Sequence, residues 1–136
     1  MTVKNAFRVA LVLWAGSLWS TVWVALTIFH SQPDRHLSGV IAARLFAIET
    51  YLGVAVALFA WARGRAARLA APRFRLGFVA VALLLFNEWV LKAIMDQALA
   101  RGSALGLGFG PWHGVSALVY LAACLAAVVA VCDGEI

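Results

Sequence analysis

The chain has 136 residues, of which 65% are hydrophobic and 12% are charged, and its formal net charge is +5. A soluble domain is about half apolar and a quarter charged, so this composition excludes a soluble protein and is typical of a membrane protein. The basic residues flank apolar segments instead of forming a patch interleaved with aromatic residues, which excludes a nucleic-acid partner and makes the lipid bilayer the expected partner.

Four apolar segments are each long enough to cross a bilayer as a helix, the one open-chain structure that satisfies its own backbone there. They cover about residues 9–29, 38–62, 76–95 and 112–132, joined by segments at 30–37, 63–75 and 96–111. Nothing is left over for a soluble domain. We therefore predict an all-α membrane protein in which residues 1–136 form one antiparallel four-helix transmembrane bundle.

Positive charge is concentrated on one side of this arrangement. The segment 63–75 carries five arginines and no acidic residue, and the leader before residue 9 carries Lys4 and Arg8. By the positive-inside rule both termini and segment 63–75 are cytoplasmic, while segments 30–37 and 96–111 lie outside. The expected location is the bacterial cytoplasmic (inner) membrane, in which the protein is multi-pass.

The first span contains a helical face that combines small residues with large indoles. Small residues permit close helix packing and tryptophans anchor a span at the interface, so we interpret this face as a packing and anchoring surface. Its members are Gly16, Trp19, Ser20, Trp23 and Thr27.

The second span contains two charged residues at different depths. Arg44 lies near its start, where a long side chain reaches the interface, whereas Glu49 lies near the midplane and is too short to do so. Gly53 and Ala57 follow Glu49 at four-residue steps, which places Glu49 on the close-packing face of the helix. Glu49 is therefore expected to point into the bundle.

The third span carries Glu88 and Lys92, four residues apart and so on one face of a helix. A charge at membrane depth is costly unless it is paired, which predicts an ion pair between them. In the fourth span, His113, Ser116, Tyr120 and Cys124 fall within a narrow arc and form a polar stripe.

All these polar side chains lie in the middle or outer half of the predicted bundle. The sequence therefore predicts an outward-facing polar pocket that binds or passes a cation, a proton or a small ligand. Its expected ligand-binding residues are Glu49, Asn87, Glu88, Lys92, His113, Ser116 and Tyr120.

Other functions remain open at this point. His30, His36 and His113 are placed at the outer ends of the spans, where neutral imidazoles converging on a copper- or zinc-like ion would form a metal site. A haem- or quinone-binding protein needs an imidazole inside the bundle, and only His113 approaches that position. An accessory or assembly subunit, acting in a homo-oligomer or a larger membrane complex, needs no ligand. An enzyme is least supported, because no nucleophile elbow, HExxH motif or phosphate loop is present and no catalytic residue is assigned.

Three segments carry a resemblance to a known family. They are ARLFAIETYLG at 43–53, LLLFN at 83–87 and WHGVSALVYLAA at 112–123. They resemble the small four-span family that includes uncharacterised bacterial membrane proteins and the eukaryotic transmembrane-protein-205-like proteins. More remotely, the layout is similar to the membrane domain of copper-resistance protein D.

The resemblance implies a role in the membrane linked to metal or drug tolerance, and no established enzymatic activity. The family pattern carries over onto Gly53, Asn87, His113, Gly114 and Ser116. Glu49, Glu88 and Lys92 have no counterpart in that pattern.

Overall fold

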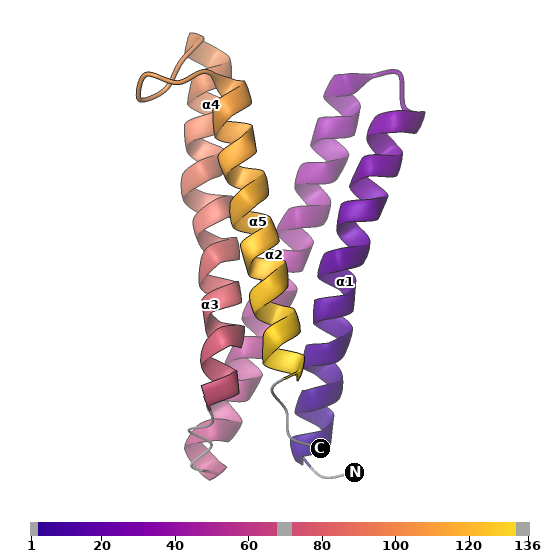
Figure 1. Cartoon of the computed structure of the whole chain (residues 1–136), viewed down its shortest axis with the longest axis vertical. Coiled ribbons are helices and arrows are strands. Elements are labelled where there is room, and N and C mark those ends of the chain that lie inside the picture. Colours follow the sequence, from indigo (N-terminus) through magenta and orange to yellow (C-terminus); the bar gives the residue numbers. More distant parts are fainter. Residues whose placement is uncertain (1–2, 68–71, 133–136) are drawn as a thin grey trace.

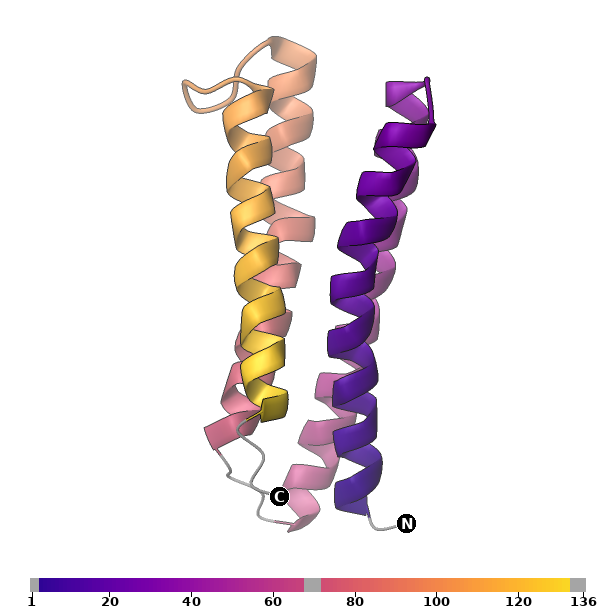
Figure 2. The same ribbon diagram turned by 45° about the vertical axis from the view of Figure 1, so that its right-hand side comes forward.

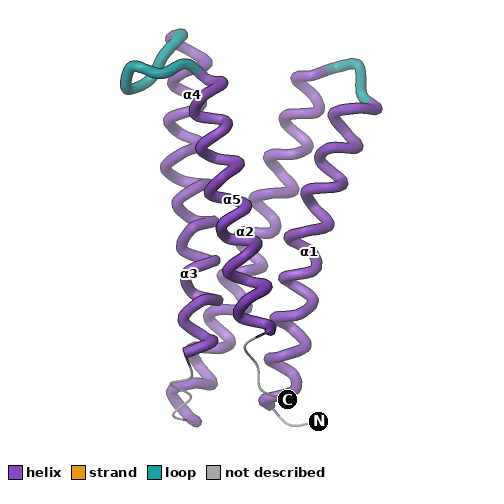
Figure 3. The backbone as a smooth tube through the Cα atoms, viewed as in Figure 1, coloured by secondary structure: helices purple, strands orange, loops and turns teal. Residues whose placement is uncertain are grey.

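The protein is described here by a computed structural model. It describes the backbone of residues 3–67 and 72–132 and the side chains of residues 5–62 and 75–132. The helices are α1 (Val3–Ser31), α2 (Arg35–Ala67), α3 (Pro72–Phe86), the π-helical turn η1 (Asn87–Leu91), α4 (Lys92–Arg101) and α5 (Phe109–Cys132). Because α3, η1 and α4 follow one another without a break, they form one rod, called here the α3–α4 rod (Figure 3).

Four helices of the described chain are long and apolar enough to span a membrane, at residues 5–31, 35–62, 75–101 and 109–132. This confirms the all-α class and the four predicted spans. The predicted loop at 96–111 is wrong at both ends, because the third span continues to Arg101 and α5 begins at Phe109. Gly102, with φ of 82°, ends the helix in the left-handed conformation that glycine adopts without a steric penalty.

The remaining connection, 102–108, contains a tight turn. The amide of Leu107 donates to the carbonyl of Ala104 at 3.1 Å, and the reverse hydrogen bond is 2.8 Å long. Leu105 and Gly106, between them, both have positive φ, as in the type I′ turn of a hairpin. The indole of Trp112 also donates to the Ala104 carbonyl at 2.8 Å, which attaches the turn to α5.

The bundle consists of two helical hairpins, α1 with α2 and the α3–α4 rod with α5 (Figures 1 and 2). The beginning of α1 and the end of α5 lie together at what we call the terminal end. The connections 32–34 and 102–108 lie at the opposite, loop end. The two hairpins diverge toward the loop end (Figure 1).

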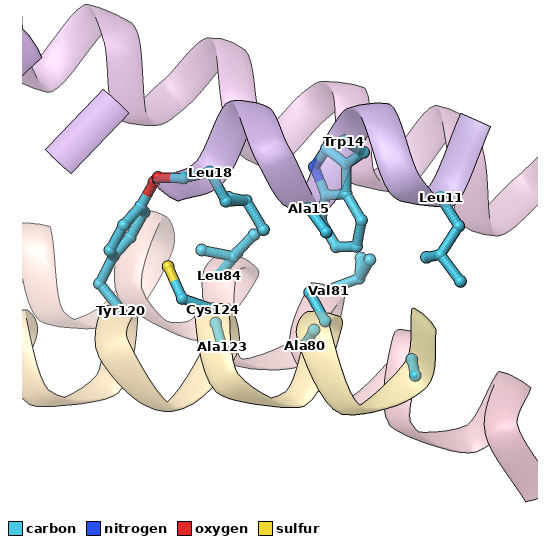
Figure 4. Close-up of a cluster of buried hydrophobic side chains, with 12 residues drawn as sticks. Leu11, Trp14, Ala15, Leu18, Ala80, Val81, Leu84, Tyr120, Ala123 and Cys124 are labelled. Carbon is cyan, nitrogen blue, oxygen red and sulfur yellow. The ribbon is translucent and has the colours of Figure 1, made fainter. Parts of the chain in front are cut away.

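A buried core joins the two hairpins (Figure 4). Its members, from Leu11 in α1 to Ala130 in α5, lie mostly in the half nearer the terminal end. Alanines of α3 and α5, such as Ala80, Ala123 and Ala127, are completely buried, because their small side chains allow these helices to approach closely. Large apolar side chains such as Leu13 and Leu118 point outward on every side, as expected of a surface covered by lipid. The core consists of Leu11, Trp14, Ala15, Leu18, Ala80, Val81, Leu84, Tyr120, Ala123, Cys124, Ala127 and Ala130.

Candidate functional site: a buried carboxyl between the first two helices

Glu49 of α2 points into the bundle, with only 6% of its surface exposed. One turn further along α2, Gly53 leaves room for the indole of Trp14 from α1. A Cβ atom at position 53 would lie 2.8 Å from Cε2 of that indole. Trp14 Nε1 donates to the backbone carbonyl of Glu49 at 3.1 Å. This close contact of α1 and α2 confirms the prediction that Glu49 faces the interior on a small-residue face.

The two oxygens of the Glu49 carboxyl have different surroundings. Oε1 accepts a hydrogen bond from the Ser17 hydroxyl and another, 3.0 Å long, from Thr21 Oγ1. Ser17 and Thr21 lie one turn apart on α1, so both reach the same face of α2. Oε2 is buried and has no hydrogen-bond partner among the residues that the structure describes. We call Glu49, Ser17 and Thr21 the Glu49 cluster.

No basic side chain compensates this carboxyl within the described part of the chain. Among residues 5–62 and 75–132, the structure contains an ion pair only between Lys92 and Glu88, and Arg44 is exposed. Tyr120 and Cys124 of α5 are titratable groups close enough to Glu49 to interact with it electrostatically. Neither of these groups carries a positive charge in any protonation state.

The predicted pairing in the third span is confirmed. Lys92 Nζ lies 2.9 Å from Glu88 Oε1, with 41% of the lysine side chain and 14% of the glutamate side chain exposed. Next to them, Asn87 of η1 is bonded to Ser116 of α5 in both directions. Ser116 Oγ donates to Asn87 Oδ1 at 2.6 Å, and Asn87 Nδ2 donates to the Ser116 carbonyl at 3.3 Å.

Tyr120 makes a third set of contacts, at the junction of the hairpins. Its hydroxyl donates to the backbone carbonyl of Leu18 at 3.0 Å, and its ring lies edge-on to Phe46 of α2 with centroids 4.7 Å apart. Figure 4 shows the hydroxyl reaching α1 beside Leu18.

The hydrogen bonds thus divide the expected pocket residues into separate groups. Glu49 bonds to α1, Asn87 bonds to Ser116, Glu88 pairs with Lys92, and Tyr120 bonds to Leu18. His113 is exposed and stacks on Phe109 of its own helix, with ring centroids 5.6 Å apart. The hydrogen bonds therefore form the Glu49 cluster and three separate contacts, and they do not link the expected pocket residues into one network.

The expected convergence of three histidines is not found. His30 and His36 flank the connection between α1 and α2, whereas His113 lies at the start of α5 in the other hairpin. Within the described residues, no group of three histidine, cysteine or acidic side chains lies close enough to hold a metal ion.

Ser17, Thr21 and Trp14 were not predicted from the sequence. The predicted packing face of α1 is the adjacent one, but Gly16, Ser20, Trp23 and Thr27 on that face are exposed in the monomer. The signal that was available is the four-residue spacing of the two hydroxyls at the same predicted depth as Glu49.

The chain was also compared with known proteins. No curated protein and no solved structure matches it. Residues 9–104, which include the whole Glu49 cluster and the Glu88–Lys92 pair, match the family described as domain of unknown function DUF4149. Because this match covers well over half of its length, the chain belongs to the DUF4149 family.

Proposed function

We propose that this multi-pass membrane protein binds a monovalent cation, in the simplest case a proton, at the Glu49 cluster. The observation that carries the proposal is the buried Oε2 atom of Glu49, which has no hydrogen-bond partner. A charged carboxylate at membrane depth costs several kcal/mol unless it is paired or solvated. Two hydroxyl donors on Oε1 compensate part of that cost, and a proton or cation on the carboxyl compensates the rest.

The other polar contacts support this assignment by contrast. Three carboxyls lie within the spans: that of Glu88 has its counter-charge on Lys92, that of Asp96 is exposed, and that of Glu49 is buried without a described counter-charge. Asn87 and Ser116 satisfy each other. In this proposal they fix the geometry of the α3–α4 rod and α5, and the ligand binds between α1 and α2.

We further propose that the loop end faces the outside of the bacterial inner membrane, since the positive-inside rule assigns the arginine-rich segment 63–75 to the cytoplasm. The resemblance to the transmembrane-protein-205-like proteins supports a physiological role in metal or drug tolerance.

Carbodiimide labelling tests the proposal, because dicyclohexylcarbodiimide reacts with protonated carboxyls in apolar surroundings. We expect wild-type protein in detergent to gain one adduct, located at Glu49 by peptide mass spectrometry, in an amount that falls as pH rises. Glu49→Gln should lose the adduct, and the matched control Glu88→Gln should keep it.

Two results would overturn the assignment. One is an adduct that survives in Glu49→Gln. The other is the absence of any adduct together with a thermal unfolding midpoint that responds neither to pH nor to alkali cations in a Glu49-dependent way. Either would leave a ligand-free accessory subunit as the better explanation.

A further inference from the structure

Building on the proposed function, we propose that the cation which competes with the proton at the Glu49 cluster is Na⁺. The side-chain atoms of the cluster that can coordinate a cation are all oxygens: the two carboxyl oxygens of Glu49 and the hydroxyls of Ser17 and Thr21. The nearby nitrogen, Trp14 Nε1, is a donor only and is already bonded. Oxygen ligands select hard cations, whereas copper and zinc prefer sites with imidazole or thiolate.

The charge of the cluster favours a monovalent ion. Its three side chains contain one ionisable group, the Glu49 carboxyl, and no described lysine or arginine pairs with it. A monovalent cation on the carboxylate makes the site neutral. A divalent cation would leave one positive charge uncompensated at membrane depth, where an unpaired charge costs several kcal/mol.

The geometry favours a small ion. Both hydroxyls already lie at hydrogen-bonding distance from the same carboxyl oxygen, 3.0 Å in the case of Thr21. Each hydroxyl has two acceptor lone pairs in addition to the proton that it donates, so it can coordinate a cation without leaving the cluster. The indole of Trp14, seated on Gly53, holds α1 and α2 close together one turn away. This spacing suits Na⁺ better than the larger K⁺.

Oε2 supplies the independent evidence for a ligand. It belongs to a side chain that is 6% exposed, and it is the carboxyl oxygen without a partner. Oε2 is therefore a buried acceptor of a carboxyl whose other oxygen is bonded to two hydroxyls, and among the described residues it has no positively charged or donor group. Na⁺ coordinated by Oε2, Ser17 and Thr21 supplies that positive charge.

The test measures how ions protect Glu49 from the carbodiimide. Purified full-length protein is labelled at constant pH and ionic strength in NaCl, LiCl, KCl or choline chloride, and its thermal unfolding is followed in the same solutions. We expect Na⁺ to slow the labelling of Glu49 and to raise the unfolding temperature, while K⁺ and choline do neither.

Thr21→Val removes one oxygen while keeping the shape of the side chain. Losing a contact to a charged group costs about 1.5–3 kcal/mol. The Na⁺ concentration that halves the labelling of Glu49 should therefore rise at least roughly tenfold. The matched control is Thr50→Val. Thr50 is also buried, at 2% exposed against 6% for Thr21, but its hydroxyl bonds to the Phe46 carbonyl of its own helix, so Na⁺ protection should be unchanged.

The same experiment distinguishes a site that does not bind Na⁺ from a site that binds no cation at all. Labelling of Glu49 that varies with pH but not with Na⁺ would show a site for protons alone and would overturn the sodium assignment. Equal protection by K⁺, or equal Na⁺ responses of Thr21→Val and wild type, would also overturn it. Absence of both labelling and ion effects would overturn both proposals.

Discussion

At the scale of single residues, Gly53 decides how closely α1 and α2 approach next to Glu49. Only a hydrogen at this position leaves space for the Trp14 ring, whose Cε2 would otherwise lie 2.8 Å from a Cβ atom. The same ring position brings Trp14 Nε1 to the Glu49 carbonyl. The hydrogen bond from Trp14 to the Glu49 carbonyl therefore depends on the absence of a side chain one turn away.

Gly53→Ala is accordingly expected to destabilise the protein. Alanine favours a helix over glycine by about 1 kcal/mol, but overpacking of a well-packed site costs about 1–3 kcal/mol. The control is Gly39→Ala on the same helix, where a Cβ atom would meet nothing within 4 Å. Thermal unfolding in detergent should show Gly53→Ala below wild type and Gly39→Ala at or above it. Equal midpoints for the two variants would contradict the packing account.

At the scale of elements, η1 is the irregular part of the third span. Its closing hydrogen bond runs from the Lys92 amide to the Asn87 carbonyl, five residues back. Such π-turns occur mostly singly within α-helices. This one carries Asn87, which bonds to Ser116 of α5, and Glu88, which pairs with Lys92. The turn therefore presents two polar groups to two different partners.

Lys92→Met is expected to destabilise the protein more than the double change Glu88→Gln with Lys92→Met, because the single change leaves an uncompensated carboxylate. Breaking a fully buried pair costs about 3–5 kcal/mol, and the effect here should be smaller since the lysine side chain is 41% exposed. Thermal unfolding of both variants measures the difference. A double variant that is no more stable than the single one would show that the pair does not hold these residues.

The sequence was sufficient to predict the four spans, since their hydropathy alone identifies them. It also predicted that Glu49 faces inward and that Glu88 pairs with Lys92, because both follow from four-residue spacing along one helix. It was not sufficient for the partners of Glu49. The first span is apolar nearly all round, so the face that meets α2, with Ser17 and Thr21, depends on the rotation of the packed helix.

The sequence could not predict the hydrogen-bond partners of the expected pocket residues, for a related reason. Ser116 and Tyr120 do share a face of α5, but that face lies between two neighbours, the α3–α4 rod and α1. Spacing along one helix fixes which side chains share a face and does not fix which helix each of them contacts. The π-turn η1 could not be predicted either, because such turns have no characteristic amino-acid composition.

At the scale of the whole molecule, the two hairpins are joined mainly by the apolar core near the terminal end. The hydroxyl of Tyr120 adds a hydrogen bond between the hairpins, to the carbonyl of Leu18. Leu18 is the residue after Ser17 of the Glu49 cluster. The hydrogen bond between the hairpins and the proposed site therefore involve consecutive residues of α1.

Tyr120→Phe should lower the free energy of unfolding by about 0.5–1.5 kcal/mol, the typical net contribution of one hydrogen bond. The edge-on contact with Phe46 is kept, because phenylalanine has the same ring. Tyr51→Phe is the control, since that tyrosine is 54% exposed. Equilibrium unfolding in detergent measures the stability of both variants. A Tyr120→Phe protein as stable as the control would show that this hydrogen bond does not stabilise the fold.

The proposed orientation of the bundle predicts on which side of the membrane each connection lies. Reporter domains fused after Gly64 and after Gly102 should report opposite sides of the membrane, with Gly64 in the cytoplasm. The measurement is paired phosphatase and fluorescent-protein activity in cells. Both reporters on one side would contradict the four-span topology, and an inverted pair would contradict the orientation alone.

The charge state of Glu49 is the most direct test of the cation site. Protein labelled with ¹³C at its glutamate carboxyl carbons contains three such residues, and the signal of Glu49 is the one missing from Glu49→Gln. We predict that this signal moves between the positions of a protonated and a deprotonated carboxyl as pH is raised, and that added Na⁺ favours the deprotonated position. A Glu49 signal that stays at one position through every change of pH and Na⁺ would contradict the account.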